Sequence, residues 1–260
     1  MLNTEERKEA ARLLLRAERD VAPVTQLDLT FPAIEIADSY AIQKEIIGIK
    51  MAAGAKLRGH KIGLTSKAMQ ATVGIDEPDY GHLLDDMFHN DGDTLAAGRY
   101  IAPRVEVELA FVLGKPLKGP GVTLFDVLSA TEYVQPALEL IDGRSKYPRR
   151  IVDNIADNAA SAGVILGGRV VRPLDIDLRW VGALLYKNGV IEESGVSAAV
   201  LGHPAMGIVW LANKLAAFDT GLEAGHILLA GSFTRTVPVG KGDTIHADYG
   251  PLGSISVHFA

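Results

Sequence analysis

Two carboxylates stand two residues apart in a mostly apolar stretch, Ile101-Ala-Pro-Arg-Val-Glu-Val-Glu-Leu-Ala-Phe-Val112. Successive side chains of a β-strand point to opposite faces, so Glu106 and Glu108 would share one face of such a strand. At ~4 Å, with an effective dielectric constant of about 20, two unit charges repel each other by roughly 4 kcal/mol. A bound cation, a shared proton or a nearby base would offset that repulsion.

A third carboxylate, Glu139, lies on a second stretch with strand-like alternation, residues 133–141. If the two strands come together, three glutamates could surround one ion. Carboxylate oxygens suit hard divalent cations such as Mg²⁺ or Mn²⁺, which keep coordination sites open for water or substrate. The alternative is that Glu106 and Glu108 lie on the solvated face of an antiparallel sheet. Their spacing alone leaves both interpretations open.

Two further candidates precede these strands. Lys61 lies in the glycine-rich stretch 59–66, where backbone can approach a ligand closely, and Asp79 lies in the turn-forming stretch 77–81. The simpler interpretations are an exposed lysine and a turn-forming aspartate. No dinucleotide-binding glycine motif, phosphate loop, HExxH or nucleophile elbow is present, and the histidines show no metal-ligand spacing.

Composition narrows the class of protein. The chain has 260 residues, 48% of them hydrophobic and 22% charged, which is enough for one sizeable core. A net charge of −6 without a basic run argues against nucleic acid as the main partner. No cysteine is present for a disulfide, a thiolate metal site or a nucleophile. The charged N-terminus does not look like a signal peptide, and the longest apolar stretch, 196–212, is broken by Pro204. We therefore expect a soluble, cytoplasmic protein that contacts no membrane.

Hydrophobic periodicity predicts helices at the front of the chain and a β-rich body behind them. Helices are expected over 4–19, from Asp38 to Gly54 and after Pro204, a helical turn at 67–70, strands at 59–66, 133–141 and 164–168, and a hairpin at 184–191. The Asn188-Gly189 pair predicts a type I′ turn in that hairpin. Residues 1–82 would form a helix-rich region carrying Lys61 and Asp79, and residues 83–260 a β-rich, metal-binding region. The two could pack as one compact unit.

Several motifs, taken in order along the whole chain, resemble one enzyme family. They are Gly59-His-Lys-Ile-Gly-Leu-Thr-Ser-Lys-Ala-Met-Gln70, Glu77-Pro-Asp-Tyr-Gly81, Pro103-Arg-Val-Glu-Val-Glu-Leu-Ala-Phe111, Pro136-Ala-Leu-Glu-Leu-Ile-Asp142, Asp157-Asn-Ala-Ala160 and Ala230-Gly-Ser-Phe-Thr234. The chain is similar to the 2-oxoalkenoate hydratases of bacterial meta-cleavage pathways, which act on 2-oxopent-4-enoate or, as the nearer resemblance, on 2-oxohept-4-ene-1,7-dioate. That family lies in the fumarylacetoacetate hydrolase-like superfamily. The resemblance implies a mixed α/β fold, a β-roll or sandwich with flanking helices and a helical N-terminal region.

The resemblance also assigns roles to residues of this chain. It implies a divalent cation, Mg²⁺ or alternatively Mn²⁺, on Glu106, Glu108 and Glu139. It places the family's acid/base lysine at Lys61 and a catalytic aspartate at Asp79. Weaker candidates for positioning substrate or water are three hydroxyl residues, Ser161, Ser232 and Thr234. No organic cofactor is implied, and a large homo-oligomer of the decamer type is expected.

The implied reaction hydrates a small 2-oxo or 2-hydroxydienoic acid to a 4-hydroxy-2-oxo acid. The C1 carboxylate and C2 oxygen would chelate the metal, a base would remove a C3 proton, C5 would be reprotonated and water would add at C4. Lys61 and Asp79 are the expected proton carriers, in an order that the sequence leaves open. A nearby cation and a low-dielectric site would lower the pKa of Lys61. A distal substrate carboxylate would call for an arginine, with four unranked candidates, Arg58, Arg104, Arg144 and Arg235.

Three other functions remain open at this point. The sister 4-oxalocrotonate decarboxylases would use the same metal and lysine, but they typically carry an apolar residue in place of Asp79, which favours the hydratase. Hydrolysis of acylpyruvates would need a water-activating His/Glu pair that the sequence does not assign. A scaffold subunit of a hydratase–decarboxylase pair would leave an intact metal and acid/base set idle.

Overall fold

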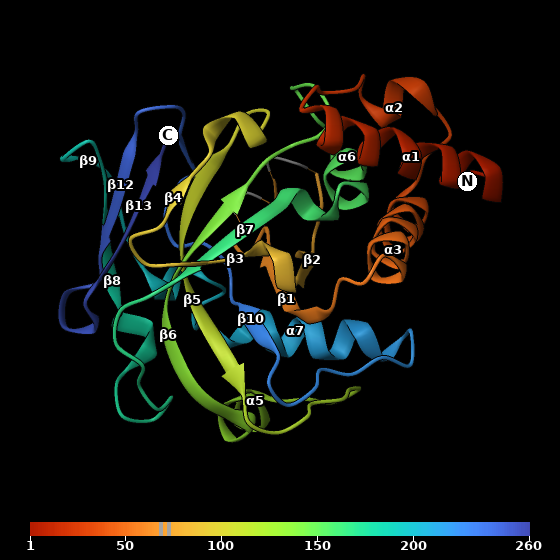
Figure 1. Ribbon diagram of the computed structural model, residues 1–260. Helices are drawn as coiled ribbons and strands as arrows, with labels where there is room; N and C mark the ends of the chain where they lie inside the picture. The colour runs from red at the N-terminus through yellow and green to blue at the C-terminus, as the bar shows by residue number, and fades with distance from the viewer. Residues whose placement is uncertain (68–69, 72–73) are drawn as a thin grey trace.

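Figure 1 shows the protein as a computed structural model, which describes residues 1–67, 70–71 and 74–260. The described α-helices are α1 (Thr4–Asp20), α2 (Leu27–Thr30), α3 (Ile36–Ala52), α5 (Leu124–Ala130), α6 (Ile151–Ala156) and α7 (Ala205–Ala216). An eight-stranded sheet contains β1 (Leu57–Gly63), β2 (Asp79–Leu84), β3 (Phe88–Asn90), β5 (Arg104–Leu113), β6 (Thr131–Ile141), β7 (Ser161–Leu166), β10 (Ile227–Leu229) and β11 (Val237–Pro238). A five-stranded sheet contains β4 (Thr94–Leu95), β8 (Gly182–Lys187), β9 (Val190–Val196), β12 (Thr244–Asp248) and β13 (Ser254–Phe259). The fold is mixed α/β, as the sequence predicts.

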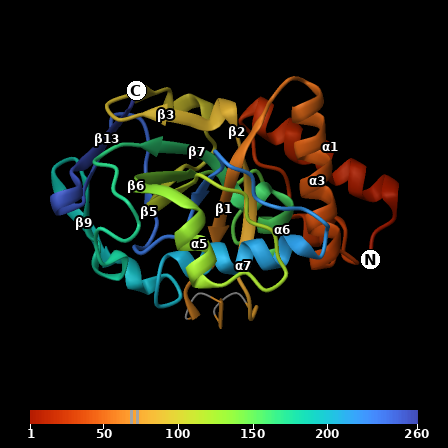
Figure 2. The ribbon, with the colours of Figure 1, turned by 90° about the horizontal axis from the view of Figure 1, so that it is seen from below.

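Both sheets are mixed, and helices flank the larger one. Its strand order is β2-β1-β10-β5-β6-β7-β3, with β11 also paired to β5, while the smaller sheet runs β4-β13-β12-β8-β9. The smaller sheet lies at one end of the molecule, and α1, α2 and α3 lie at the other (Figure 1). Helices α5 and α7 pack against each other along the underside of the larger sheet (Figure 2). The centre of the larger sheet is therefore enclosed on several sides.

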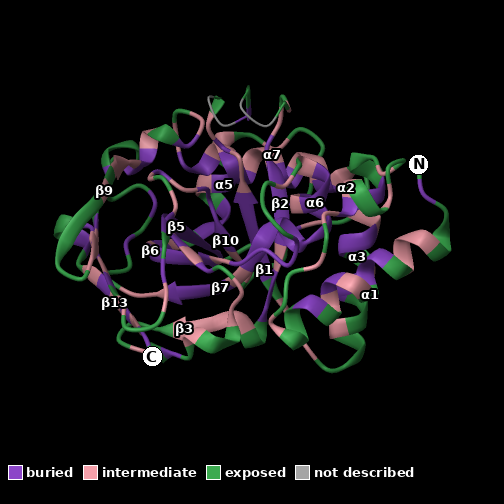
Figure 3. Ribbon diagram, turned by 90° about the horizontal axis from the view of Figure 1, so that it is seen from above, coloured by how far each residue is buried: buried purple, intermediate pink, exposed green. Residues whose placement is uncertain are grey.

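The main hydrophobic core includes one face of β5. Val105, Val107, Leu109 and Phe111 are each 0% exposed and belong to one cluster with side chains of the smaller sheet, such as Ile245. Fully burying such side chains contributes roughly 1.5–3 kcal/mol each. Figure 3 shows these buried strands in the middle of the molecule, with exposed residues on the outer helices and on β9. The predicted alternation along β5 is confirmed, and it turns the glutamates to the opposite face.

The N-terminal helices form a smaller core of their own. Helix α1 begins with a capping box, in which Asn3 Oδ1 accepts from the Glu6 N–H at 3.0 Å and the Asn3 N–H donates to Glu6 Oε2 at 2.8 Å. Leu14 of α1, Ile42 of α3 and Ala156 of α6 belong to one buried cluster. The helices predicted over 4–19 and from Asp38 are confirmed, with α3 beginning two residues earlier, at Ile36.

Strands β1 and β2 belong to the larger sheet although they precede residue 85. β1 pairs in parallel with β10 and antiparallel with β2. The structure thus places β1 and β2 in the same sheet as β5, and through these strands the first part of the chain reaches the carboxylates of the second.

Other predicted elements are confirmed with small shifts of their ends. Asn188 and Gly189 have φ values of 53° and 81°, which is the type I′ geometry expected between β8 and β9. Pro204 directly precedes α7. The helical turn predicted at 67–70 includes residues 68–69, which lie outside the described residues. No helix in the described part of the chain is both long enough and apolar enough to cross a membrane.

Candidate active site

Three glutamates come together on the face of β5 and β6 that points away from the main core. Glu106 of β5 lies directly opposite Glu139 of β6 in the antiparallel register, and Glu108 lies two residues further along β5. One oxygen from each side chain lies within 4.8 Å of the other two. Glu108 and Glu139 are fully buried. We call Glu106, Glu108 and Glu139 the glutamate cluster.

The oxygens of the glutamate cluster are under-supplied with hydrogen-bond donors. Glu108 Oε2 accepts from the Gly231 N–H at 2.8 Å, whereas Glu108 Oε1 and both oxygens of Glu139 have no hydrogen-bond partner among the described residues. Burial and the other carboxylates raise the pKa of Glu108 well above its usual range, and burial raises the pKa of Glu139 to about 7. Oxygen donors with free lone pairs and a local excess of negative charge fit a hard divalent cation.

Lys61 supplies the nearest positive charge. Its Nζ lies 3.1 Å from Glu139 Oε2, as an ion pair without hydrogen-bond alignment, and the side chain is only 6% exposed. Burial alone would lower the pKa of Lys61, but the surrounding carboxylates, Glu139 first, raise it above its ordinary value. The attraction of several carboxylates therefore outweighs the cost of burial. The lowered pKa predicted from the sequence is that of Lys61 beside a bound cation, and it stays a prediction.

Asp79 enters the site from β2, beside Lys61. In the β1–β2 pairing Asp79 lies opposite Gly63, where a Cβ atom would collide with the Asp79 carboxylate, so only glycine leaves room for this side chain. Asp79 is fully buried, its Oδ1 has no hydrogen-bond partner among the described residues, and its Oδ2 accepts from Asn154 Nδ2 at 2.8 Å. Burial raises the pKa of Asp79 despite the nearby Lys61 ammonium.

Asn154 of α6 is a site residue that sequence reasoning missed. Its Oδ1 accepts from Arg149 Nη2 at 3.3 Å, and Arg149 Nη1 in turn donates to Asp157 Oδ2 at 3.1 Å. Because the amide oxygen faces the arginine, the amide NH₂ must face Asp79. No local motif signals this contact, since Asn154 and Asp79 are 75 residues apart in the chain.

A cavity of about 950 Å³ opens onto this set of residues. Lys61, Asp79, Glu106 and Asn154 line it, together with the predicted hydroxyl residues Ser232 and Thr234. The Ser232 hydroxyl donates to the Thr234 carbonyl at 2.9 Å, and the Thr234 hydroxyl accepts from the Val107 N–H at 3.4 Å. These two hydroxyls therefore bind backbone in the segment that follows β10, beside the glutamate cluster.

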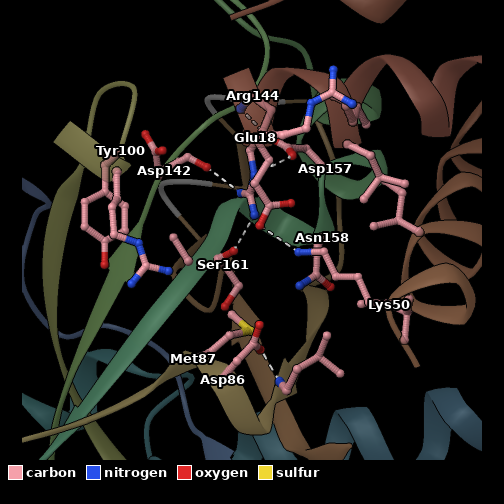
Figure 4. A pocket seen from close by; sticks show the side chains of 18 of the residues that line it. Glu18, Lys50, Asp86, Met87, Tyr100, Asp142, Arg144, Asp157, Asn158 and Ser161 are labelled. Atoms are coloured by element: carbon pink, nitrogen blue, oxygen red, sulfur yellow. Dashed lines mark hydrogen bonds and ion pairs between the residues drawn. The ribbon is translucent and has the colours of Figure 1, made fainter. Parts of the chain in front are cut away.

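Ser161 lies elsewhere. It lines a second cavity of about 310 Å³, shown in Figure 4, with its carbonyl accepting from Arg144 Nη2 at 2.8 Å. Ala159 and Ala160, which precede it, line the first cavity instead. The structure thus does not bring Ser161 together with Lys61 and Asp79, because the chain turns at the start of β7 and directs it to the other side.

A buried cluster of paired charges lies at the second cavity. We call it the arginine–aspartate cluster: Arg144 and Asp157, which line the cavity, and Arg149, which pairs with Asp157. Arg144 Nε lies 3.3 Å from Asp157 Oδ1, and the Arg144 N–H donates to Asp157 Oδ2 at 2.7 Å. Arg149 Nη1 lies 3.1 Å from the same Oδ2. Burial raises the pKa of Asp157 although both arginines oppose that shift.

Comparison with known proteins assigns the chain to a family. The family model described as "Fumarylacetoacetate (FAA) hydrolase C-terminal" matches residues 60–260. The chain belongs to the fumarylacetoacetate hydrolase family. Within this family it is 59% identical to the 2-oxo-hept-4-ene-1,7-dioate hydratase of Escherichia coli over 96% of both chains. It is 40% identical to the 4-oxalocrotonate decarboxylase of Pseudomonas sp. strain CF600, over 94% of this chain and 92% of that one.

A solved structure extends the family likeness to the whole fold. The 4-oxalocrotonate decarboxylase of Pseudomonas putida G7, solved in complex with magnesium and adipate, is 39% identical and superposes with a TM-score of 0.97. The match covers 100% of this chain and 99% of the other. The mixed fold and the family that the sequence predicts are therefore both confirmed.

Proposed function

We propose that this protein is a metal-dependent hydratase that adds water to a 2-oxoalk-4-enoate, specifically 2-oxohept-4-ene-1,7-dioate, and forms a 4-hydroxy-2-oxo acid. The observation that carries this proposal is the meeting of Lys61, Asp79 and the glutamate cluster at one cavity. The 59% identity to a hydratase of that name supports the choice of substrate. Such a reaction belongs to the catabolism of aromatic compounds.

Glu106, Glu108 and Glu139 would hold the cation, Mg²⁺ by preference and Mn²⁺ as an alternative. The structure of a relative with bound magnesium supports this assignment. When bound, such an ion supplies positive charge where negative charge develops on the substrate. Glu108 Oε1 and Glu139 Oε1, which have neither a hydrogen bond nor an ion pair among the described residues, are oxygens that fit it.

Lys61 and Asp79 would handle protons above the glutamate cluster. The substrate must lose a proton at C3 and gain one at C5 before water can add at C4. The Lys61 ammonium can donate a hydrogen bond to a negatively charged substrate oxygen, and Asp79, held by Asn154 with one oxygen free, can accept and return a proton. Ser232 and Thr234 would shape the wall of the cavity through their backbone contacts.

Decarboxylation of a 2-oxo acid is the second candidate, because relatives 39–40% identical are 4-oxalocrotonate decarboxylases. Incubating the protein and Mg²⁺ with 2-hydroxydienoates of five, six and seven carbons separates the two functions. We expect the seven-carbon diacid to be hydrated fastest, without release of CO₂. Release of CO₂ from a 4-oxalocrotonate-type substrate, without hydration of any member of the panel, would refute the hydratase.

Assembly and location form a further part of this proposal. We propose a large homo-oligomer of the decamer type in the cytoplasm, with a helix-rich part at residues 1–82 and a metal-binding part at 83–260. Light scattering of the purified protein measures the assembly directly. A monomer at micromolar concentration would refute it.

A further inference from the structure

The cavity beside the glutamate cluster is lined by both acidic and basic side chains. Besides Lys61, two arginines line it, Arg104 and Arg235. The other two arginine candidates from the sequence lie outside the cavity lining: Arg144 belongs to the second cavity, and Arg58 is exposed on β1. The structure thereby ranks four arginines that the sequence could not.

Arg104 lies on the same face of β5 as two members of the glutamate cluster. Side chains two residues apart on a strand share a face, so Arg104, Glu106 and Glu108 form one row. At about 3.3 Å per residue, Arg104 lies about 7 Å from Glu106 and about 13 Å from Glu108 along the strand. Burial decreases along this row, from a fully buried Glu108 to the partly exposed Glu106 and Arg104. The cavity therefore has an acidic inner end, and Arg104 lies toward its outer end. Glu192 and Glu193 also line the cavity.

The segment after β10 runs beside this row and contributes the second arginine. At the inner end the Gly231 N–H donates to Glu108 Oε2 at 2.8 Å. At the outer end Arg104 donates from Nε to Thr236 Oγ1 at 2.5 Å and from Nη2 to the Thr236 carbonyl at 3.1 Å. Arg235, the residue before Thr236, therefore lies at the same outer end of the cavity.

The two guanidinium groups differ in how their charge is used. The hydrogen-bond acceptors of Arg104 on Thr236 are both neutral. Among the described residues, Arg104 forms no salt bridge. Arg235 Nη2 lies 2.8 Å from Glu193 Oε1, with the arginine 86% exposed and the glutamate 16% exposed. Glu193 holds Arg235 at the wall while most of its donors face solvent. A guanidinium offers five N–H donors in a planar fork that matches a carboxylate, so both arginines have donors left for a ligand.

We propose that Arg104 and Arg235 form a subsite for the distal carboxylate of a dicarboxylate substrate. This inference rests on the proposed function for the end of the substrate that reacts. With its 2-oxo acid end at the glutamate cluster, a linear seven-carbon diacid would extend along the β5 row, and its second carboxylate would reach the two arginines at the outer end. A five-carbon monoacid has no second carboxylate to contact the arginines, so water would occupy that end of the cavity. The subsite would therefore set the preference for a diacid.

Binding of two inert ligands tests the subsite without any turnover. The saturated acids 2-oxoheptanedioate and 2-oxoheptanoate share the 2-oxo acid end and differ only in the distal carboxylate. Calorimetric titration into the Mg²⁺-loaded protein should show at least tenfold tighter binding of the diacid. In the Arg104→Gln/Arg235→Gln double variant this preference should fall at least tenfold, because each glutamine keeps a donor but loses the charge. Arg58→Gln, an exposed arginine outside the cavity, is the matched control and should keep the full preference.

A smaller fall in the double variant, or an unmodified protein without a tenfold preference for the diacid, overturns the subsite. Thermal unfolding of the double variant separates a lost preference from a lost fold, and binding of 2-oxoheptanoate is the reference for each variant. Both ligands lack the 4-ene, so neither can be hydrated. Failure of the substrate panel would therefore defeat the proposed hydratase and leave this test of the arginine subsite standing.

Discussion

The protein contains two buried charge clusters that are built in opposite ways. In the arginine–aspartate cluster each charged group has a partner: Asp157 pairs with Arg144 at 3.3 Å (Figure 4) and with Arg149 at 3.1 Å. In the glutamate cluster, Glu139 Oε2 lies 3.1 Å from the Lys61 ammonium, but Glu108 Oε1 and Glu139 Oε1 have neither a hydrogen-bond nor an ion-pair partner among the described residues. A buried charge without a partner costs much more than one that is paired and hydrogen-bonded.

The difference indicates that the arginine–aspartate cluster stabilises the fold, whereas the glutamate cluster binds a ligand. The partnered cluster ties α6 to the loop after β6 and thereby holds Asn154 in place. The glutamate cluster leaves two oxygens free to bind a ligand, and proteins accept such a cost in stability at functional sites. Variants in the first cluster should therefore change folding, and variants in the second should change chemistry.

The largest effect is expected from removing the proton carrier at the glutamate cluster. Asp79→Asn keeps the size of the side chain and removes its ability to take a proton, so the hydration rate should fall by about 10²–10⁴-fold. Metal binding and the unfolding temperature should change little, and calorimetry and thermal unfolding check both. Hydration within tenfold of the unmodified protein would remove Asp79 from the chemistry.

Breaking the arginine–aspartate cluster should have an effect of similar size in free energy, but on the stability of the fold. Asp157→Ala leaves two buried arginines without their carboxylate, which should lower the free energy of unfolding by about 3–5 kcal/mol. Asp177→Ala is the matched control, since Asp177 and Arg179 form an exposed ion pair and should contribute less than about 1 kcal/mol. Urea unfolding measures both variants. Equal losses in the two would show that burial of the cluster does not matter.

A smaller effect is expected where the two clusters meet. Asn154→Ala removes the donor to Asp79 Oδ2 and should lower kcat about tenfold with little change in KM. Asn154→Asp has nearly the same shape but places a second carboxylate beside Asp79, so its kcat should be lower than that of the alanine variant. If Asn154 only fills space, the order reverses, with the aspartate variant the more active.

The smallest effect is expected to be an increase in stability, in contrast to the loss predicted for Asp157→Ala. Glu108→Gln removes one of three neighbouring negative charges, so the metal-free protein should be more stable by about 1–2 kcal/mol. Its hydration activity should be lost at the same time. Urea unfolding in the presence of a chelator measures the change, with Glu132→Gln, an exposed glutamate on β6, as control. A destabilised Glu108→Gln variant would mean that the glutamate cluster contributes to stability.

Local patterns in the sequence predict the helices and strands, but they do not predict which side chains from different elements meet in the site. Alternation along β5 places Glu106 and Glu108 on one face, and Asn188-Gly189 predicts its turn, because both signals depend on neighbouring residues. The pairing of Glu106 with Glu139 and the contact between Asn154 and Asp79 depend on sheet register and on where α6 packs. Local periodicity does not carry that information.

One expectation differed from the structure, and a second feature was not visible in the sequence for a related reason. Ser161 was expected as a weaker candidate for positioning substrate or water, but it lines the second cavity. Several carboxylates from three different strands surround the Lys61 ammonium and raise its pKa. Both depend on groups that are distant in sequence, and only the assembled sheet shows them.

The most direct test of the glutamate cluster is a metal titration combined with a rate. Calorimetry with Mg²⁺ or Mn²⁺ should show one ion per chain for the unmodified protein and no binding for Glu106→Gln/Glu108→Gln. The hydration rate with the seven-carbon 2-hydroxydienoate should be lost together with the ion. Full hydration by the metal-free double variant would contradict the central role of the glutamate cluster.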